Sequence, residues 1–187
     1  MTTAGPDGAP PHDVPSTRPD PPSAWSWARP GSCGDGSTPT IRGVTVLALT
    51  TAPTHGAPLV AHETLSLVEG VGIEEDRHAG RRRQVTIVCT GELAEAATIH
   101  GVDAIDGVAT RRNIVVEAAS LPRSHGTRFS IGDVEFAVWR DCAPCELMDD
   151  AFGPGAKIAL RRRCGISATV VRGGTVRLGD PVRLPTS

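Results

Sequence analysis

The sequence has few aromatic residues, no tyrosine and a single lysine. Aromatic residues make up 3% of the 187 residues, so the core must be built from Val, Ile, Leu and Ala, which favours β-strand packing. The formal net charge of -2 argues against nucleic-acid binding through bulk positive charge. The sequence lacks an apolar leader and any run near ~18 apolar residues. We therefore expect a cytoplasmic protein without membrane or nucleic-acid partners.

Proline is concentrated near the N-terminus, where nine of the 16 prolines precede residue 40 (6, 10, 11, 15, 19, 21, 22, 30 and 39). Gly, Ser, Asp and Thr make up most of the rest of that stretch, and such a composition cannot bury a core. Residues 1–40 are therefore predicted to be a disordered Pro/Gly-rich tail, and residues 41–187 to form one domain.

From residue 41 onward, short β-branched runs alternate with glycine-containing turns. Strand patterns occur at 41–49, 84–88, 114–116, 129–139 (a hairpin) and 166–184 (a final meander). One helix is predicted with Thr90 as its N-cap and Gly101 after its end, and a second over residues 156–164. Many short strands with few helices indicate a mainly β fold, either a closed or a nearly closed β-barrel.

Two of the five cysteines, Cys142 and Cys145, flank Ala143-Pro144 after a strand pattern and before a short helical run. A thiol at a strand end beside a helix start is partly exposed and meets the positive end of the helix dipole. It is therefore a candidate nucleophile or sulfur carrier. A zinc site would need His78, Cys89 or Cys164 to converge on this pair. A thioredoxin-like pair would need a βαβ unit, and the spacing alone also fits two small core residues.

Arginine supplies 18 of the 19 cationic side chains, and several arginines are clustered, at 81–83, 111–112 and 161–163. Each cluster by itself is typical of a solvated face, but two clusters flanking one cavity would hold a phosphorylated ligand. Within Asp76-Arg77-His78, Arg77 could contact an anion and His78 could transfer a proton or hydrogen bond. Asn113 could hydrogen bond to a heterocycle.

Taken in order, these segments resemble the MOSC domain, which is shared with the C-terminal part of molybdenum cofactor sulfurase. The matching segments are 72–80, 83–86, 111–116, 129–134, 142–145, 165–168, 173–174 and 179–182. The resemblance covers residues 41–184 and implies a pyruvate-kinase-type β-barrel with a few short helices. It also implies a cysteine that carries sulfur or ligates molybdenum, which by position is Cys145.

The resemblance further implies the members of the site. Catalytic roles would fall to Cys145, Cys142 and His78, metal ligation to Cys145, and cofactor contacts to Asp76, Arg77, Arg83, Arg111, Arg112 and Asn113. The implied function is to bind the molybdenum cofactor, to carry a persulfide on Cys145 for transfer to a metal–sulfur or organic acceptor, or both. A cysteine desulfurase would donate the sulfur and a sulfur-accepting enzyme or cofactor would receive it. No pyridoxal phosphate is expected on this chain, because nothing resembles its lysine site and Lys157 is the only lysine.

Two other functions fit the same resemblance. One is a molybdenum-dependent oxidoreductase that reduces N-hydroxylated compounds, with Cys145 as the metal ligand. The other is a non-catalytic cofactor-binding adaptor. Such reductases usually carry extra sequence, whereas this chain ends at Ser187, soon after Gly179-Asp180-Pro181-Val182. This favours the sulfur carrier or the adaptor.

Overall fold

The structure is a computed structural model that describes residues 44–185. The predicted tail, residues 1–40, lies outside the described residues. The strands are β1 (Val46–Thr51), β2 (Val60–His62), β3 (Thr64–Leu67), β4 (Val85–Cys89), β5 (Ile114–Val116), β6 (Arg128–Ile131), β7 (Val134–Asp141), β8 (Ile166–Arg172), β9 (Gly174–Arg177) and β10 (Val182–Arg183). The helices are α1 (Thr90–His100), α2 (Leu147–Phe152) and α3 (Ala156–Ala159).

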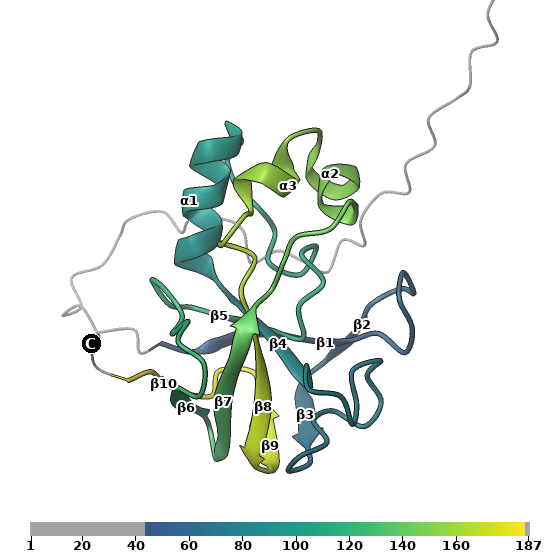
Figure 1. The fold of residues 1–187 in the computed structure, drawn as a ribbon, viewed down its shortest axis with the longest axis vertical. Coiled ribbons are helices and arrows are strands. Elements are labelled where there is room, and N and C mark those ends of the chain that lie inside the picture. The colour runs from purple at the N-terminus through teal and green to yellow at the C-terminus, as the bar shows by residue number, and fades with distance from the viewer. Residues whose placement is uncertain (1–43, 186–187) are drawn as a thin grey trace, which may run out of the picture. The chain divides into compact units, whose positions relative to one another are not determined.

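An eight-stranded sheet with the order β10-β6-β7-β8-β4-β5-β1-β2 forms most of the fold (Figure 1). β4 and β5 are parallel and are joined through α1, whereas the other neighbours in this sheet are antiparallel. Every residue of β4 and β5 is buried, as expected for β-branched strands in the middle of a sheet. The mainly β prediction is confirmed.

The sheet is not closed into a barrel. Its two edge strands are β10 and β2, and a single bridge joins Thr45 to Pro181, just before β10. Hydrogen bonds from Val46 N to Asp180 O and from Val182 N to Val44 O flank this bridge, and the pairing stays short because β10 has only two residues. The predicted final meander is also wrong. β9 follows β8 along the chain but pairs with β3 in a separate two-stranded sheet, so it is not hydrogen bonded to β8 as a meander requires.

The three helices gather at one end of the sheet (Figure 1). α1 begins one residue earlier than predicted: Cys89 is the N-cap and Thr90 is already helical. Gly101 ends α1 as predicted, with φ of 79° and its N–H donated to Ala97 O. The predicted helix over 156–164 is shorter, because the chain turns after α3 and reaches φ of 63° at Arg162.

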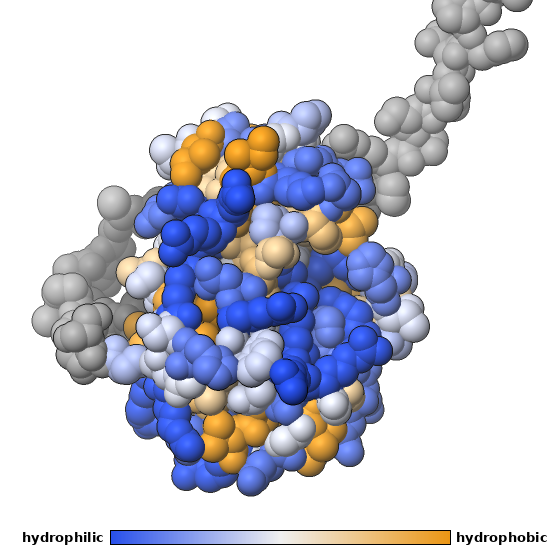
Figure 2. All heavy atoms as spheres, in the orientation of Figure 1, coloured by the Kyte–Doolittle hydropathy of each residue, from blue (hydrophilic) through white to orange (hydrophobic). Residues whose placement is uncertain are grey.

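Aliphatic side chains fill the core, as the composition predicts, with Phe129 and Phe136 stacked at a centroid distance of 5.3 Å. A second cluster lies under the helices and includes Val88, Met148 and Cys164. The face drawn in Figure 2 is mostly hydrophilic, with apolar atoms in separate patches. Within residues 44–185, the helices are all too short or too polar to cross a membrane.

Candidate functional site

A small cavity of about 130 Å³ lies beside Cys145, whose side chain is exposed. Four segments far apart in the sequence form it: the loop at 55–56, the turn at 77–83, the segment before β5, and the loop between β7 and α2 together with the start of α2. Its lining residues are His55, Gly56, Arg77, His78, Arg83, Thr110, Arg111, Arg112, Ala143, Cys145, Leu147 and Met148. These include four arginines and no Asp or Glu, so the cavity attracts anions.

Two of the three arginine clusters therefore meet at one cavity, through Arg83 and through Arg111 and Arg112. Arg111 has φ of 63°, an uncommon conformation for a residue with a Cβ, which costs about 1–3 kcal/mol and is frequent at functional sites. Its guanidinium donates to Ala57 O, which fixes the side chain at the cavity. The third cluster, 161–163, lines other parts of the surface.

The buried Asp76 carboxylate holds the turn that carries Arg77 and His78. Its Oδ2 accepts hydrogen bonds from Ala52 N at 3.1 Å and Asn113 Nδ2 at 2.9 Å, and its Oδ1 accepts from His78 N at 3.0 Å. Arg77 Nη1 lies 3.8 Å from Oδ2. Asp76 thus supports the cavity from behind its wall and is absent from its lining.

Asn113 is also placed behind the wall. Its Oδ1 accepts from Thr86 N at 3.0 Å and from Thr86 Oγ1 at 2.8 Å, and its Nδ2 donates to Thr50 O at 3.2 Å as well as to Asp76. These four bonds occupy the two acceptor and two donor positions of the amide. Asn113 therefore joins β1, β4 and the Asp76 turn, and its amide has no free group for a heterocycle.

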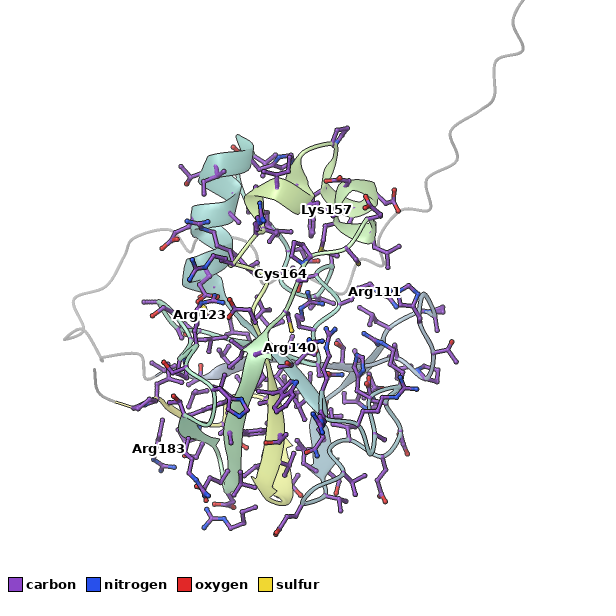
Figure 3. The ribbon with its side chains drawn as sticks, viewed as in Figure 1. Arg111, Arg123, Arg140, Lys157, Cys164 and Arg183 are labelled. Carbon is purple, nitrogen blue, oxygen red and sulfur yellow. The ribbon has the colours of Figure 1, made fainter. Side chains whose placement is uncertain are left out.

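Arg112 is held in place by Cys164, a residue that the sequence analysis assigned no role at this cavity. Arg112 Nε donates to Cys164 O at 2.8 Å, and Nη2 donates to Cys164 Sγ at 2.8 Å and to Ala143 O at 3.5 Å. Burial raises the pKa of the Cys164 thiol, and the Arg112 charge opposes this shift only in part. Cys164 lies between the helices and the sheet (Figure 3). No motif marks it, because it follows a helical run as an ordinary small apolar residue.

Two buried polar atoms of residues that line the cavity, His78 Nε2 and Arg83 Nε, have no hydrogen-bond partner. Burial together with the charges of Arg83 and Arg77 lowers the pKa of His78 to about 4, so His78 is neutral at pH 7. An unpaired buried polar atom costs about 1–3 kcal/mol. An ordered water or a bound ligand beside the cavity would provide the missing partners.

The two cysteines of the Cys142–Cys145 pair face different hollows. Cys142 is buried, accepts a hydrogen bond from Arg83 Nη2 at 3.6 Å, and lines a separate groove of about 650 Å³. Ala143 lines both the cavity and the groove. Within residues 44–185, no group of three or more His, Cys, Asp or Glu side chains is arranged to hold a metal ion, so the described residues offer no zinc site.

A family model for the MOSC domain matches residues 74–183, which include every predicted site residue. Among solved structures, the YuaD protein from Bacillus subtilis is 22% identical, with a TM-score of 0.64 over 74% of this chain and 94% of that one. YiiM from Geobacillus stearothermophilus is 13% identical, with a TM-score of 0.57 and coverage of 76% and 75%. YiiM from Escherichia coli is 16% identical, with a TM-score of 0.52 and coverage of 76% and 70%. These likenesses show a shared fold. No curated protein matches the chain.

Proposed function

Because the chain belongs to the MOSC domain family, we propose that it carries sulfur as a persulfide on Cys145 and passes that sulfur to a metal–sulfur or organic acceptor. One observation carries the proposal: the exposed Cys145 lies at a cavity lined by four arginines and no carboxylate. A persulfide held on Cys145 and the thiolate that leaves the donor are anions, so the four guanidiniums stabilise both beside the exposed cysteine.

The transfer needs no external oxidant or reductant. The Cys145 thiolate attacks the outer sulfur of a donor persulfide, a new S–S bond forms to Cys145, and the donor's S–S bond breaks. The donor leaves as a thiolate, and the proton on the outer sulfur moves with that sulfur. The proposed donor is a cysteine desulfurase in the cytoplasm. A pyridoxal phosphate site needs a lysine, and the only lysine of this sequence, Lys157, is paired with Glu146. We therefore assign the release of sulfur from cysteine to a separate protein.

The surrounding residues have separate roles in this proposal. Arg83 and Arg111 attract the anionic donor, and Arg112 stabilises the sulfur on Cys145 while Cys164 fixes its orientation. His78 is neutral at pH 7 and offers a hydrogen bond through Nε2 without adding charge. Cys142 contacts Arg83 from the other side of the loop.

A second function, binding of the molybdenum cofactor, is favoured by the unpartnered His78 Nε2 and Arg83 Nε. The donor set fits this group, because Arg77, Arg83 and Arg111 would hold its phosphate and the Cys145 thiolate would ligate its metal through sulfur. When bound, the cofactor would supply the two-electron chemistry needed to reduce N-hydroxylated compounds. Asn113 and Asp76 would support this site only indirectly, since both are engaged internally.

One purification tests both functions. The protein is isolated anaerobically, its molybdenum content is measured, and its mass is recorded after incubation with a cysteine desulfurase and cysteine. We expect an adduct of about 32 Da, one sulfur atom, on wild-type protein and on Cys89→Ala, and none on Cys145→Ser. Stoichiometric molybdenum that disappears in Cys145→Ser supports the second function instead. If neither adduct nor metal is found, both proposals fail and a non-catalytic adaptor is left.

A further inference from the structure

The cavity beside Cys145 has an excess of positive charge that the protein does not balance. Of its four arginines, only Arg77 lies near a carboxylate, with Nη1 at 3.8 Å from Asp76 Oδ2. In the part of the chain that the structure describes, no acidic side chain forms an ion pair with the other three arginines. Four guanidiniums against one carboxylate leave an excess of three positive charges.

The carboxylates next in the chain to Cys145 do not reduce this excess. Glu146 is paired with Lys157, and both Glu146 and Asp149 line the neighbouring groove instead of this cavity. Burial lowers the pKa of Arg77, Asp76 opposes this shift, and the three other arginines of the cavity add to it. Like charges held together in a partly buried site repel one another, so an anion between them would stabilise all four.

Arg112 and Arg83 show most directly what is missing. Arg112 is 5% exposed, yet its hydrogen-bond acceptors are neutral: Cys164 O, Cys164 Sγ and Ala143 O. A buried cation is costly unless an opposite charge lies close to it. The Nε of Arg83 is buried and has no acceptor among the described residues. A water could accept from Arg83, but only an anion would also balance the charge of Arg112.

The volume of the cavity restricts which anion can enter. It is about 130 Å³, below the roughly 300–1,000 Å³ of sites that enclose drug-sized ligands. It equals the space of about four water molecules, at roughly 30 Å³ each, which is the size of a tetrahedral oxyanion. Cys145 lines the same cavity and is exposed, so it can reach a sulfur atom carried by such an anion.

We infer that this cavity binds a small dianion with a transferable sulfur, a thiosulfate-type donor in which the outer sulfur is bonded to an SO₃ group. The inference rests on the proposed function and names a substrate class for the same site. The guanidiniums would bind the SO₃ oxygens, which would also accept from Arg83 Nε and from the Nε2–H tautomer of His78. The outer sulfur would then be left for Cys145.

The transfer balances without an added oxidant or reductant. The Cys145 thiolate attacks the outer sulfur, and a new S–S bond forms as the bond between that sulfur and the SO₃ group breaks. The electron pair of the broken bond leaves with the SO₃ group, which departs as sulfite, and no proton has to move. The negative charge that develops on the sulfite oxygens is stabilised by guanidiniums that are already in place.

The test uses thiosulfate alone, on anaerobic protein freed of reductant. Sulfite release is followed over time, and the intact mass records an adduct of about 32 Da. Wild type and Cys89→Ala should give equal amounts of sulfite and adduct, at a rate that saturates as thiosulfate is raised, and Cys145→Ser should give neither. Inorganic phosphate, a tetrahedral anion without a transferable sulfur, should compete with thiosulfate.

Arg83→Gln should lower the rate with thiosulfate by at least about tenfold, and Arg82→Gln, which lies outside the cavity lining, should leave it unchanged. Dithiodipyridine, which is small and uncharged, should react with Cys145 equally in wild type and both variants, as expected if all three are folded. The inference is overturned if wild type forms no adduct from thiosulfate, if the rate does not saturate, or if both variants are slowed equally.

A parallel incubation with a cysteine desulfurase and cysteine separates this inference from the proposed function. If the desulfurase transfers sulfur to Cys145 and thiosulfate does not, the inference fails and the proposed function stands. If thiosulfate transfers sulfur and the desulfurase does not, the proposed supply of sulfur by a desulfurase fails and the inference stands.

Discussion

Cys89 and Cys145 occupy comparable local positions, because each lies where the chain passes from a strand to the helix that follows it, Cys89 as the last residue of β4 and Cys145 in the loop after β7. Cys89 ends β4 and is the N-cap of α1, a helix of 11 residues, whereas Cys145 precedes α2, which has only six. A helix-dipole argument by itself would therefore select Cys89 as the reactive thiol. The structure separates the two by their surroundings.

Cys89 is fully buried, and burial together with the nearby charge of Glu92 raises its pKa to about 12. Its Sγ lies 4.0 Å from Ala119 O, and the nearby charge of Arg123 opposes the rise of its pKa only in part. Cys145 is exposed and shares its cavity with four arginines. The difference shows that segments distant in the sequence decide which cysteine can react.

The largest expected effect is on the alkylation of the two thiols. At pH 7.5 with iodoacetamide, Cys145 should be modified at least about 100-fold faster than Cys89, because the thiolate fraction falls about tenfold per unit of raised pKa. Mass mapping of the labelled peptides at timed intervals measures both rates. Comparable labelling of the two residues in native protein would show that the contrast between them is wrong.

The next effect concerns the support behind the cavity. Asp76→Ala removes the acceptor of three hydrogen bonds, from Ala52 N, His78 N and Asn113 Nδ2, and should lower the free energy of unfolding by about 3 kcal/mol. Urea unfolding measures this change. Glu74→Ala, at an exposed position in the same turn, is the control and should stay within about 0.5 kcal/mol of wild type.

A smaller effect is expected from the cavity charge. Arg83→Gln should slow the reaction of Cys145 with an anionic thiol reagent, dithionitrobenzoate, by about tenfold, because the field at the cavity becomes less positive. Arg82→Gln is the matched control, since Arg82 is exposed and lies over the Trp139 ring at 5.5 Å. Stopped-flow absorbance measures the two rates. If both variants slow the reaction equally, general surface charge is responsible.

The smallest effect is on the pH dependence of stability. Burial disfavours the charged form of His78 as it does that of Cys89, and it lowers the His78 pKa to about 4. Between pH 6.5 and 4 the unfolded chain therefore binds a proton that the folded chain does not, and the free energy of unfolding falls as the pH falls. His78→Gln should reduce this fall by on the order of 1 kcal/mol. His125→Gln, at an exposed site, should leave the curve unchanged in urea titrations.

Sequence patterns anticipated the mainly β class, and five of the residues named from them line the cavity beside Cys145: Arg77, His78, Arg83, Arg111 and Arg112. They did not anticipate that the side-chain amide of Asn113 forms all of its hydrogen bonds within the protein. The partners of a side chain depend on which strands become neighbours in the fold. Strand pairing also explains the error at β9, whose partner β3 lies far earlier in the chain. Cys164 was missed for the same reason, as only the folded sheet places it against Arg112.

The bonds of Asn113 also bear on the order in which the chain is synthesised and folds. Its partners Thr50, Asp76 and Thr86 all precede it, so each has been translated by the time residue 113 leaves the ribosome. Domains generally fold as units during synthesis, and Cys145 is made later than Arg77, Arg83, Arg111 and Arg112. The four arginines that line the cavity are therefore synthesised before the cysteine that they surround.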